Sequence, residues 1–141
     1  HPGGSIGQKL LLVKDLMLKG NKLPLINFKS NILKAIQIIN SKNLGIGIII
    51  KNKFAIGIVT DGDIRRGAKT FSKKNKISIL MSRKPFYISE NDSAEKALSI
   101  MSEKKITSLL VSSAKDYNKK RVSFKPTGIL HIHSLLKYGI K

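Results

Sequence analysis

Residues 54–67 read FAIGIVTDGDIRRG, an apolar run that ends in a turn rich in polar groups. The apolar part, Phe54 to Val59, has the β-branched composition of a strand, and we expect a helix to begin just after it. A strand that runs into the N-terminus of a helix gathers several free backbone N–H groups at one point. Such a point can hold a phosphate, so this junction is the first candidate binding site.

Four side chains at the junction have the chemistry of a nucleotide site. Thr60 can donate a hydrogen bond to a phosphate oxygen, and Asp63, one helical turn further on, can accept from both hydroxyls of a ribose. Arg65 and Arg66 add charge-assisted donors. A plainer interpretation is that Asp61 or Asp63 caps the helix and that the arginines are solvated. For the carboxylates taken alone, the plainer interpretation is the stronger one.

The composition is that of a folded chain with an unusual charge. The 141 residues give room for one compact domain or two very small ones that share a core, and 41% of them are hydrophobic. The formal net charge of +19, taken alone, indicates a nucleic-acid or acidic-membrane partner. The lysines are scattered along the chain, however, and aromatic residues make up only 6%. We therefore expect a solvated basic surface that attracts small anions, with neither nucleic acid nor membrane as partner.

The chain contains no cysteine, which excludes disulfides and thiolate metal sites and is compatible with a cytoplasmic location. The longest apolar stretch, residues 44–59, is interrupted by Lys51, Asn52 and Lys53, so neither part is long enough to cross a bilayer. The sequence shows no catalytic triad pattern and no phosphate loop with Lys-Ser or Lys-Thr. We expect no metal site and no required cofactor.

Hydrophobic spacing predicts a first unit of helix and hairpin. Residues 30–42 carry apolar side chains at i, i+3, i+4 and i+7, which places them on one helix face, with Ser30 or Asn31 as N-cap. Residues 44–50 and 54–59 are β-branched runs joined by a short polar turn, which predicts a hairpin.

A second unit of similar layout follows. A capping box of Asp92 and Glu95 precedes another stretch with helical apolar spacing. Residues 108–111 are expected to form the next strand, and residues 128–131 stand where residues 57–60 stood in the first unit.

Two alignments indicate an internal duplication. Met17 aligns with Met81, and Gly57 aligns with Gly128. The extra residues of the second unit fall in 113–126, which we expect to form a polar, lysine-rich loop or long hairpin at the surface.

The pattern Gly-apolar-x-Thr-x-x-Asp at residues 57–63 resembles the nucleotide-contacting signature of CBS (cystathionine-β-synthase-type) domains. The longer string GIVTDGDIRR resembles, more narrowly, the CBS region of bacterial arabinose-5-phosphate isomerases. The opening HPGGSIG of residues 1–7 is similar to the end of the sugar-isomerase (SIS) domain in those enzymes. Since the chain also lacks an initiating methionine, we expect it to be a fragment of a longer protein.

The resemblance implies a tandem CBS pair, or Bateman module. The fold class would be α/β of the α+β type, with two β-α-β-β-α repeats whose small sheets pack together and whose helices lie outside. The expected domains are an SIS tail over residues 1–12, a first CBS domain over 13–69, a linker over 70–76 and a second CBS domain over 77–141.

The resemblance also implies two unequal clefts. In the first, Thr60 would contact phosphate and Asp63 the ribose, with Leu23, Pro24 and Leu25 near the base or sugar.

The second cleft departs from the family pattern, because His131 replaces the threonine and Ser134 the aspartate. A single hydroxyl cannot hold a vicinal diol as a carboxylate does, so ribose should bind weakly there or not at all. His131 and His133 alone are thin support for a metal site. We favour polar residues that touch a phosphate when protonated.

By the same resemblance, His1 would correspond to a catalytic histidine of the parent isomerase, and the fragment itself would be non-catalytic. The parent would convert ribulose 5-phosphate to arabinose 5-phosphate for Kdo and lipopolysaccharide synthesis. The CBS pair would sense CMP-Kdo or an adenine nucleotide and act on its own SIS domain in a homo-oligomer. The rival hypotheses are a purely structural module without ligand, and a related isomerase with another sugar-phosphate substrate.

Overall fold

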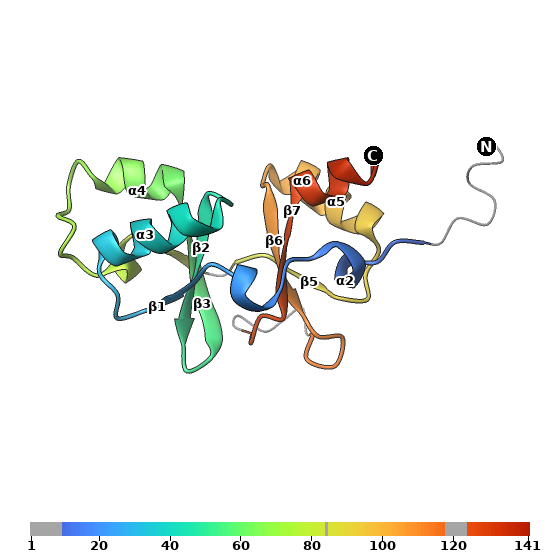
Figure 1. Cartoon of the computed structure of the whole chain (residues 1–141), viewed down its shortest axis with the longest axis horizontal. Coiled ribbons are helices and arrows are strands. Elements are labelled where there is room, and N and C mark those ends of the chain that lie inside the picture. Colours follow the sequence, from blue (N-terminus) through green and yellow to red (C-terminus); the bar gives the residue numbers. More distant parts are fainter. Residues whose placement is uncertain (1–9, 84, 118–123) are drawn as a thin grey trace.

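The computed structural model describes residues 10–83, 85–117 and 124–141. The chain forms two halves that lie side by side, each a small sheet with helices packed on it (Figure 1). The first sheet has four strands in the order β1-β2-β3-β4, and the second has three in the order β5-β6-β7. The predicted α/β arrangement of two small sheets is therefore confirmed.

The repeated elements of the first half are β1 (Leu25–Asn27), α3 (Ile32–Lys42), β2 (Ile46–Lys51), β3 (Phe54–Thr60) and α4 (Asp61–Gly67). Those of the second half are β5 (Tyr87–Ser89), α5 (Ala94–Lys104), β6 (Ser108–Ser112), β7 (Gly128–His131) and α6 (Ile132–Lys137). Four short elements lie outside the repeats: α2 (Val13–Leu16), the 3-10 turns η1 (Gly20–Lys22) and η2 (Ile77–Ile79), and β4 (Ser82–Arg83). In both halves the first repeated strand is parallel to the second, and the second is antiparallel to the third, as a β-α-β-β-α repeat requires.

Helix α3 forms where the apolar spacing predicted it. Its N-cap is Asn31, whose side chain accepts a 2.8 Å hydrogen bond from the Lys34 N–H. Ile32, Ala35 and Ile39 are buried in the core of the first half. Complete burial of an isoleucine side chain contributes roughly 1.5–3 kcal/mol, so this face stabilises the helix more than its intrinsic propensity does.

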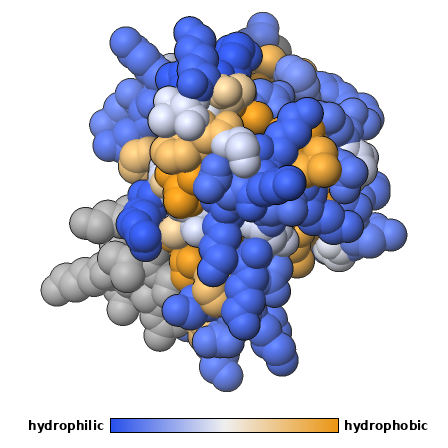
Figure 2. Space-filling view, turned by 90° about the vertical axis from the view of Figure 1, so that its left-hand side faces the viewer, coloured by the Kyte–Doolittle hydropathy of each residue, from blue (hydrophilic) through white to orange (hydrophobic). Residues whose placement is uncertain are grey.

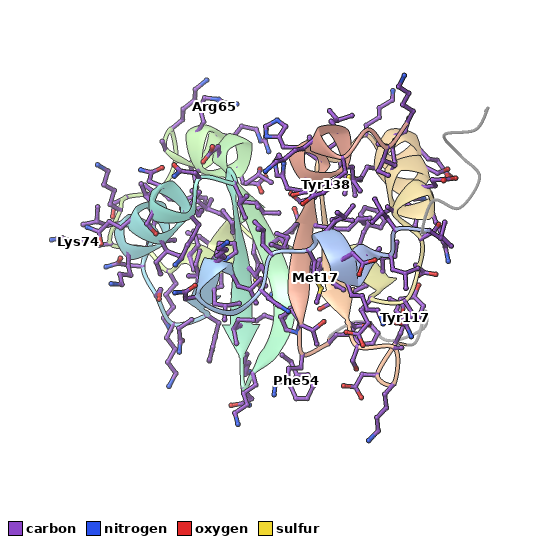
Figure 3. The ribbon with its side chains drawn as sticks, turned by 45° about the vertical axis from the view of Figure 1, so that its right-hand side comes forward. Met17, Phe54, Arg65, Lys74, Tyr117 and Tyr138 are labelled. Carbon is purple, nitrogen blue, oxygen red and sulfur yellow. The ribbon has the colours of Figure 1, made fainter. Side chains whose placement is uncertain are left out.

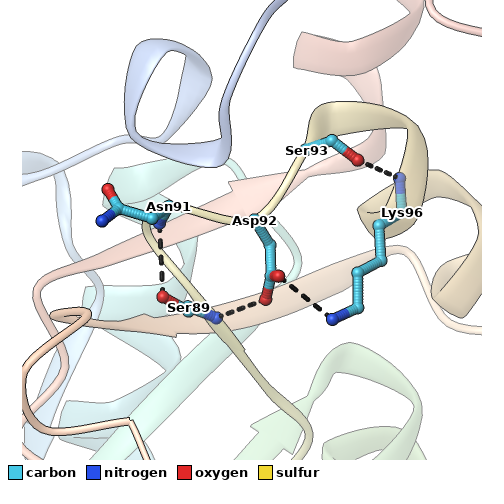
Figure 4. Close-up of polar contacts among 5 residues, drawn as sticks. All are labelled: Ser89, Asn91, Asp92, Ser93 and Lys96. Atoms are coloured by element: carbon cyan, nitrogen blue, oxygen red, sulfur yellow. Dashed lines mark hydrogen bonds and ion pairs between the residues drawn. The ribbon is translucent and has the colours of Figure 1, made fainter.

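Helix α5 begins differently from the prediction. Its N-cap is Ser93, whose hydroxyl accepts from the Lys96 N–H at 3.0 Å (Figure 4). The Asp92 carboxylate instead accepts from the Ser89 N–H at 3.1 Å and from the Lys96 ammonium at 3.0 Å. The predicted capping box of Asp92 and Glu95 is therefore wrong, because Asp92 closes the turn after β5 and leaves the cap to its neighbour.

The segment before β1 packs on the second half. In Figure 1, α2 lies beside β5, far from the strands that follow it in sequence. The Val13 N–H donates to the Asp92 carbonyl at 2.8 Å, and Leu18 exchanges both backbone hydrogen bonds with Ile129 of β7, at 2.9 and 3.0 Å. Val13 and Leu16 are buried in the core of the second half.

The segment that joins the halves packs, conversely, on the first half. Strand β4 pairs antiparallel with β3, with Ser82 opposite Ile58. Ile77 in η2 is fully buried in the core of the first half. The two repeats thus exchange segments: residues 12–18 complete the second half, and residues 77–83 complete the first.

This exchange bears on the predicted domains. The boundaries 13–69 and 77–141 follow the sequence repeat, whereas the contacts assign the start of each range to the opposite half. The boundaries themselves remain a prediction.

An apolar core joins the two halves. Its buried members are Leu23, which precedes β1, and residues of both sheets: Ile46, Ile48, Ala55, Leu110 and Ile129. The halves therefore share hydrophobic area, as expected for units too small to bury a core alone.

The insertion between β6 and β7 also reaches this interface, although its residues 118–123 lie outside the described part. Phe124 is 1% exposed, and its carbonyl accepts a 2.7 Å hydrogen bond from the Ala55 N–H of β3. The ring of Tyr87 lies on Phe124 with centroids 4.3 Å apart, and its hydroxyl accepts from the Phe124 N–H at 3.1 Å. Burial raises the pKa of Tyr87 to about 12. The prediction of a surface loop is therefore wrong for the end of the insertion.

The outer end of the first half is covered mainly by hydrophilic residues, with hydrophobic residues visible between them (Figure 2). In the described part of the chain, every helix is too short or too polar to cross a membrane.

Candidate functional site

A cavity of about 570 Å³ lies between the two halves. Its volume is within the range of about 300–1,000 Å³ that is usual for small-molecule sites. The lining residues fall into two stretches of sequence. Those between the end of α3 and the start of α4 are Leu44, Gly45, Ile46, Ile58, Thr60, Asp61, Gly62 and Asp63. Those from β4 onward are Ser82, Arg83, Pro85, Phe86, Lys105, Ile106, Thr107, Ser108 and Leu110. A ligand in this cavity would touch both halves.

The start of α4 places Thr60 and Asp63 on the cavity wall. Thr60 is the N-cap, and its hydroxyl accepts from the Asp63 N–H at 3.2 Å. In return, Oδ2 of Asp63 accepts from the Thr60 N–H at 2.9 Å. These reciprocal bonds form a capping box, so the plainer interpretation of Asp63 as a capping residue is correct. The same geometry holds both predicted ligand-binding side chains at the cavity.

The two arginines lie beside the cavity and are not among its lining residues. Nη2 of Arg66 lies 2.6 Å from Oδ1 of Asp63, and the Arg66 side chain is 71% exposed. Arg65 is exposed on α4 and lies at the end of the molecule opposite Phe54 (Figure 3). The structure thus brings Arg66 to Asp63, one helical turn away.

The structure does not bring Leu23, Pro24 and Leu25 to this cavity. Leu23 and Pro24 are buried, the former in the core between the halves, and Leu25 is exposed on β1. Pro85 and Phe86 line the cavity instead. The pairing of β4 with β3 brings the segment that contains Pro85 and Phe86 next to the first sheet.

The cavity is also lined by two cations that sequence reasoning missed. Arg83 is in β4, opposite Gly57 of β3, and so belongs to the same sheet as Thr60, whereas Lys105 is the left-handed C-cap of α5, with φ 56°. Phe86 is 45% exposed, and the Lys104 ammonium lies 5.5 Å from its ring centroid. The lining therefore combines carboxylates with cations and an aromatic ring. These groups can accept hydrogen bonds from the hydroxyls of a ligand and bind an anionic group.

The residues of the predicted second cleft lie at the start of α6 and are not among the lining residues of this cavity. His131 is the N-cap of α6, and its Nδ1 accepts from the His133 N–H at 3.1 Å. The two rings lie 4.4 Å apart, and burial, followed by the charge of His133, lowers the pKa of His131. Ser134 is partly buried in the first turn of α6. Among the described residues, no group of three His, Cys, Asp or Glu side chains is placed to hold a metal.

His1, the predicted catalytic residue of the parent enzyme, lies outside the described residues.

The fold and the family comparison agree. The model of the CBS domain family matches residues 76–141. The chain superposes on the CBS domain pair of protein MJ0100, in complex with 5′-methylthioadenosine and S-adenosyl-L-methionine, with a TM-score of 0.75 and 23% identity over 92% of this chain and 96% of that one. It also superposes on CBSX2 in complex with AMP, with a TM-score of 0.73 and 20% identity over 91% and 95% of the two chains. The chain therefore has the fold of a CBS domain pair, and the family model matches its second half.

One curated relative is an enzyme. The chain is 37% identical over 144 residues to arabinose 5-phosphate isomerase KdsD of Francisella tularensis, an alignment that covers 100% of this chain and 42% of that enzyme. It spans about two fifths of the first curated relatives it matches (41% and 42%). In the relatives named as isomerases, it matches the C-terminal part. The resemblance that the sequence predicted is therefore confirmed.

Proposed function

We propose that this CBS pair is a nucleotide-sensing regulatory module and that the cavity between its halves is the sensing site. The observation that carries the proposal is the composition of the cavity wall. Thr60 and Asp63 of the first half line the same cavity as Arg83 and Lys105. A ribose needs acceptors for its hydroxyls and a phosphate needs cationic donors, and this wall contains both.

Regulation follows from the position of the cavity. A ligand that touches both halves favours the relative placement of the halves in which it makes the most contacts. Its differential affinity for two placements is the free energy available to bias the parent protein.

Two effectors suit the cavity, and neither is a required cofactor. The solved CBS pairs with this fold include complexes with AMP and with S-adenosyl-L-methionine, which supports an adenine nucleotide. CMP-Kdo, the end product that the isomerase resemblance implies, offers a ribose, a phosphate and a carboxylate to a basic site.

We place the module in an arabinose-5-phosphate isomerase that converts ribulose 5-phosphate to arabinose 5-phosphate for lipopolysaccharide synthesis. The name of the Francisella relative supports this assignment. The parent would be a cytoplasmic homo-oligomer whose SIS domain performs the chemistry, and His1 would serve that domain. An assay of the whole protein with ribulose 5-phosphate and with other ketose phosphates tests the substrate.

Isothermal titration calorimetry of the chain with AMP, ATP, CMP and CMP-Kdo tests the sensing site. Asp63→Asn keeps an oxygen that can accept from the Thr60 N–H but loses the charge and one acceptor. A hydrogen bond to a charged group contributes about 1.5–3 kcal/mol, so we expect this variant to weaken binding about ten-fold or more. Asp15→Asn, which makes the same change at a capping aspartate that does not line the cavity, is the matched control and should bind nearly as the wild type. Absence of binding by any of the four nucleotides would refute the proposal.

A second candidate is a purely structural CBS module. The observation that favours it is the capping box, because Thr60 and Asp63 already satisfy each other without a ligand. In that case Asp63→Asn would change the free energy of unfolding, while no nucleotide would bind to either protein.

A further inference from the structure

The two oxygens of Asp63 have partners of different kinds. Oδ2 accepts from the backbone N–H of Thr60 at 2.9 Å, within the capping box. Oδ1 accepts from Nη2 of Arg66 at 2.6 Å. The side chain of Asp63 is only 17% exposed, whereas that of Arg66 is 71% exposed. The helix therefore holds one oxygen, and a solvated side chain that is free to leave holds the other.

The guanidinium of Arg66 also lies close to the cavity. A β-carbon on Gly62 would stand 3.2 Å from Nη1 of Arg66 and 3.6 Å from the Thr60 hydroxyl oxygen. Gly62 and Thr60 both line the cavity, and Arg66 does not. Arg66 therefore reaches over the first turn of α4 and closes on Asp63 at the edge of the cavity.

We infer that Arg66 competes with the ribose of a bound nucleotide for Asp63. Arg66 therefore lowers the affinity of the site for the nucleotide and does not itself bind the nucleotide. The inference rests on the proposed function. A ribose held through both hydroxyls needs Oδ1 as well as Oδ2. A carboxylate oxygen can accept two hydrogen bonds, but the guanidinium is a broad donor that closes on Oδ1 at 2.6 Å, so in this proposal it moves aside to admit the ribose hydroxyl. Exposed ion pairs are weak, and this competition should lower the affinity by about two- to five-fold.

Arg66→Ala tests the inference, with Arg65→Ala as its matched control. Each variant removes one exposed arginine from α4, so each has the same effect on net charge. The Arg65 guanidinium lies 3.7 Å from the same β-carbon position on Gly62 but forms no ion pair within the described residues. The probes are AMP and 2′,3′-dideoxy-AMP, which lacks the diol.

We expect Arg66→Ala to bind AMP about two- to five-fold more tightly than Arg65→Ala does. The two variants should bind dideoxy-AMP equally, because that ligand makes no demand on Oδ1. Tighter AMP binding by Arg65→Ala would show that Arg66 contacts the ligand, and equal AMP binding would show that the ion pair has no effect. Either result overturns the inference.

Salt provides a second readout. Adenosine has no phosphate, so salt acts on its binding mainly by screening the ion pair between Asp63 and Arg66. Its affinity should rise with salt in the wild type and stay constant in Arg66→Ala, and a constant wild-type affinity would contradict the competition. Thermal unfolding verifies that both variants are folded. If the wild type binds AMP and Asp63→Asn does not, but Arg66→Ala gains nothing, this inference alone fails; if the wild type binds no nucleotide, the proposed function fails with it.

Discussion

Met81 lies against Gly57 where β4 pairs with β3: a β-carbon on Gly57 would stand 2.8 Å from the Met81 sulfur and 2.8 Å from the Ser82 carbonyl oxygen. The second half repeats this relationship, with the Met17 sulfur 2.5 Å from the corresponding point on Gly128. Each methionine thus contacts the glycine of the other repeat. Met17 and Met81 are equivalent in the two repeats, as are Gly57 and Gly128, and each pair in contact joins one repeat to the other because the halves exchange segments.

Gly57→Ala should destabilise the protein by about 1–3 kcal/mol, because one of the atoms it would crowd belongs to the backbone and cannot easily move. Urea denaturation measures the effect. Adding Met81→Ala removes the contact with sulfur but not the contact with the Ser82 carbonyl, so the double variant should recover only part of the loss. An unchanged denaturation midpoint for Gly57→Ala would contradict the close packing of β4 on β3.

The corrected cap of α5 gives a second prediction. Ser93→Ala removes the acceptor of the Lys96 N–H and should cost about 1 kcal/mol. Glu95→Ala removes the side chain that a capping box would have required, and should change the free energy of unfolding by less than about 0.5 kcal/mol. The same denaturation experiment compares the two variants. A larger loss in Glu95→Ala than in Ser93→Ala would restore the capping box.

His131 should make stability depend on pH. Burial and the neighbouring His133 lower its pKa in the folded state, so the unfolded chain binds the proton more readily. The free energy of unfolding should therefore fall as the pH drops below about 6.5, the ordinary pKa of histidine. Protonation of Nδ1 also removes the acceptor of the His133 N–H.

Chemical denaturation between about pH 5.5 and pH 8 checks this dependence. His131→Asn retains a capping oxygen but does not titrate, and should show a flatter profile than the wild type. His133→Gln removes the weaker of the two causes and should fall between them. Parallel profiles for wild type and His131→Asn would assign the pH dependence to other groups.

The apolar side of the proposed site gives a fourth prediction. Phe86 lines the cavity and Leu25 does not, although both are about equally exposed, at 45% and 44%. Phe86→Ala should weaken AMP binding about ten-fold, within the roughly 1–3 kcal/mol expected for a base stacked on an aromatic ring. Leu25→Ala should leave it unchanged. Calorimetry of the two variants distinguishes the structure from the sequence-based expectation, which placed Leu25 near the ligand.

The limits of the sequence-based predictions have a physical cause. Apolar spacing correctly located α3 and its Asn31 cap, because periodicity reports which face of an element is buried. It does not report which of two similar cores receives that face. The resemblance pointed to Pro24, which lies in the same half of the sequence as Thr60, whereas Pro85, in the segment after β4, lines the cavity.

The same limit applies to charges. The motif located Thr60 and Asp63, since a local string of residues carries that signal. Arg83 and Lys105 reach the cavity through a strand pairing and a left-handed helix cap, and neither has a local signature that points to a ligand. The capping box of Thr60 and Asp63 is itself local, and the sequence left it open beside the binding role.

The exchange of segments also orders the folding of the chain during synthesis. The first sheet can be completed once Arg83 has left the ribosome, because β4 is its last strand. Residues 12–18 are made before that sheet begins, yet their partners are Asp92 and, last of all, Ile129. The Val13 end of this segment can therefore pair once Asp92 is made, whereas Leu18 remains unpaired until β7 is made. A chain that stopped before Gly128 would contain one finished sheet and an N-terminal segment without its partner strand.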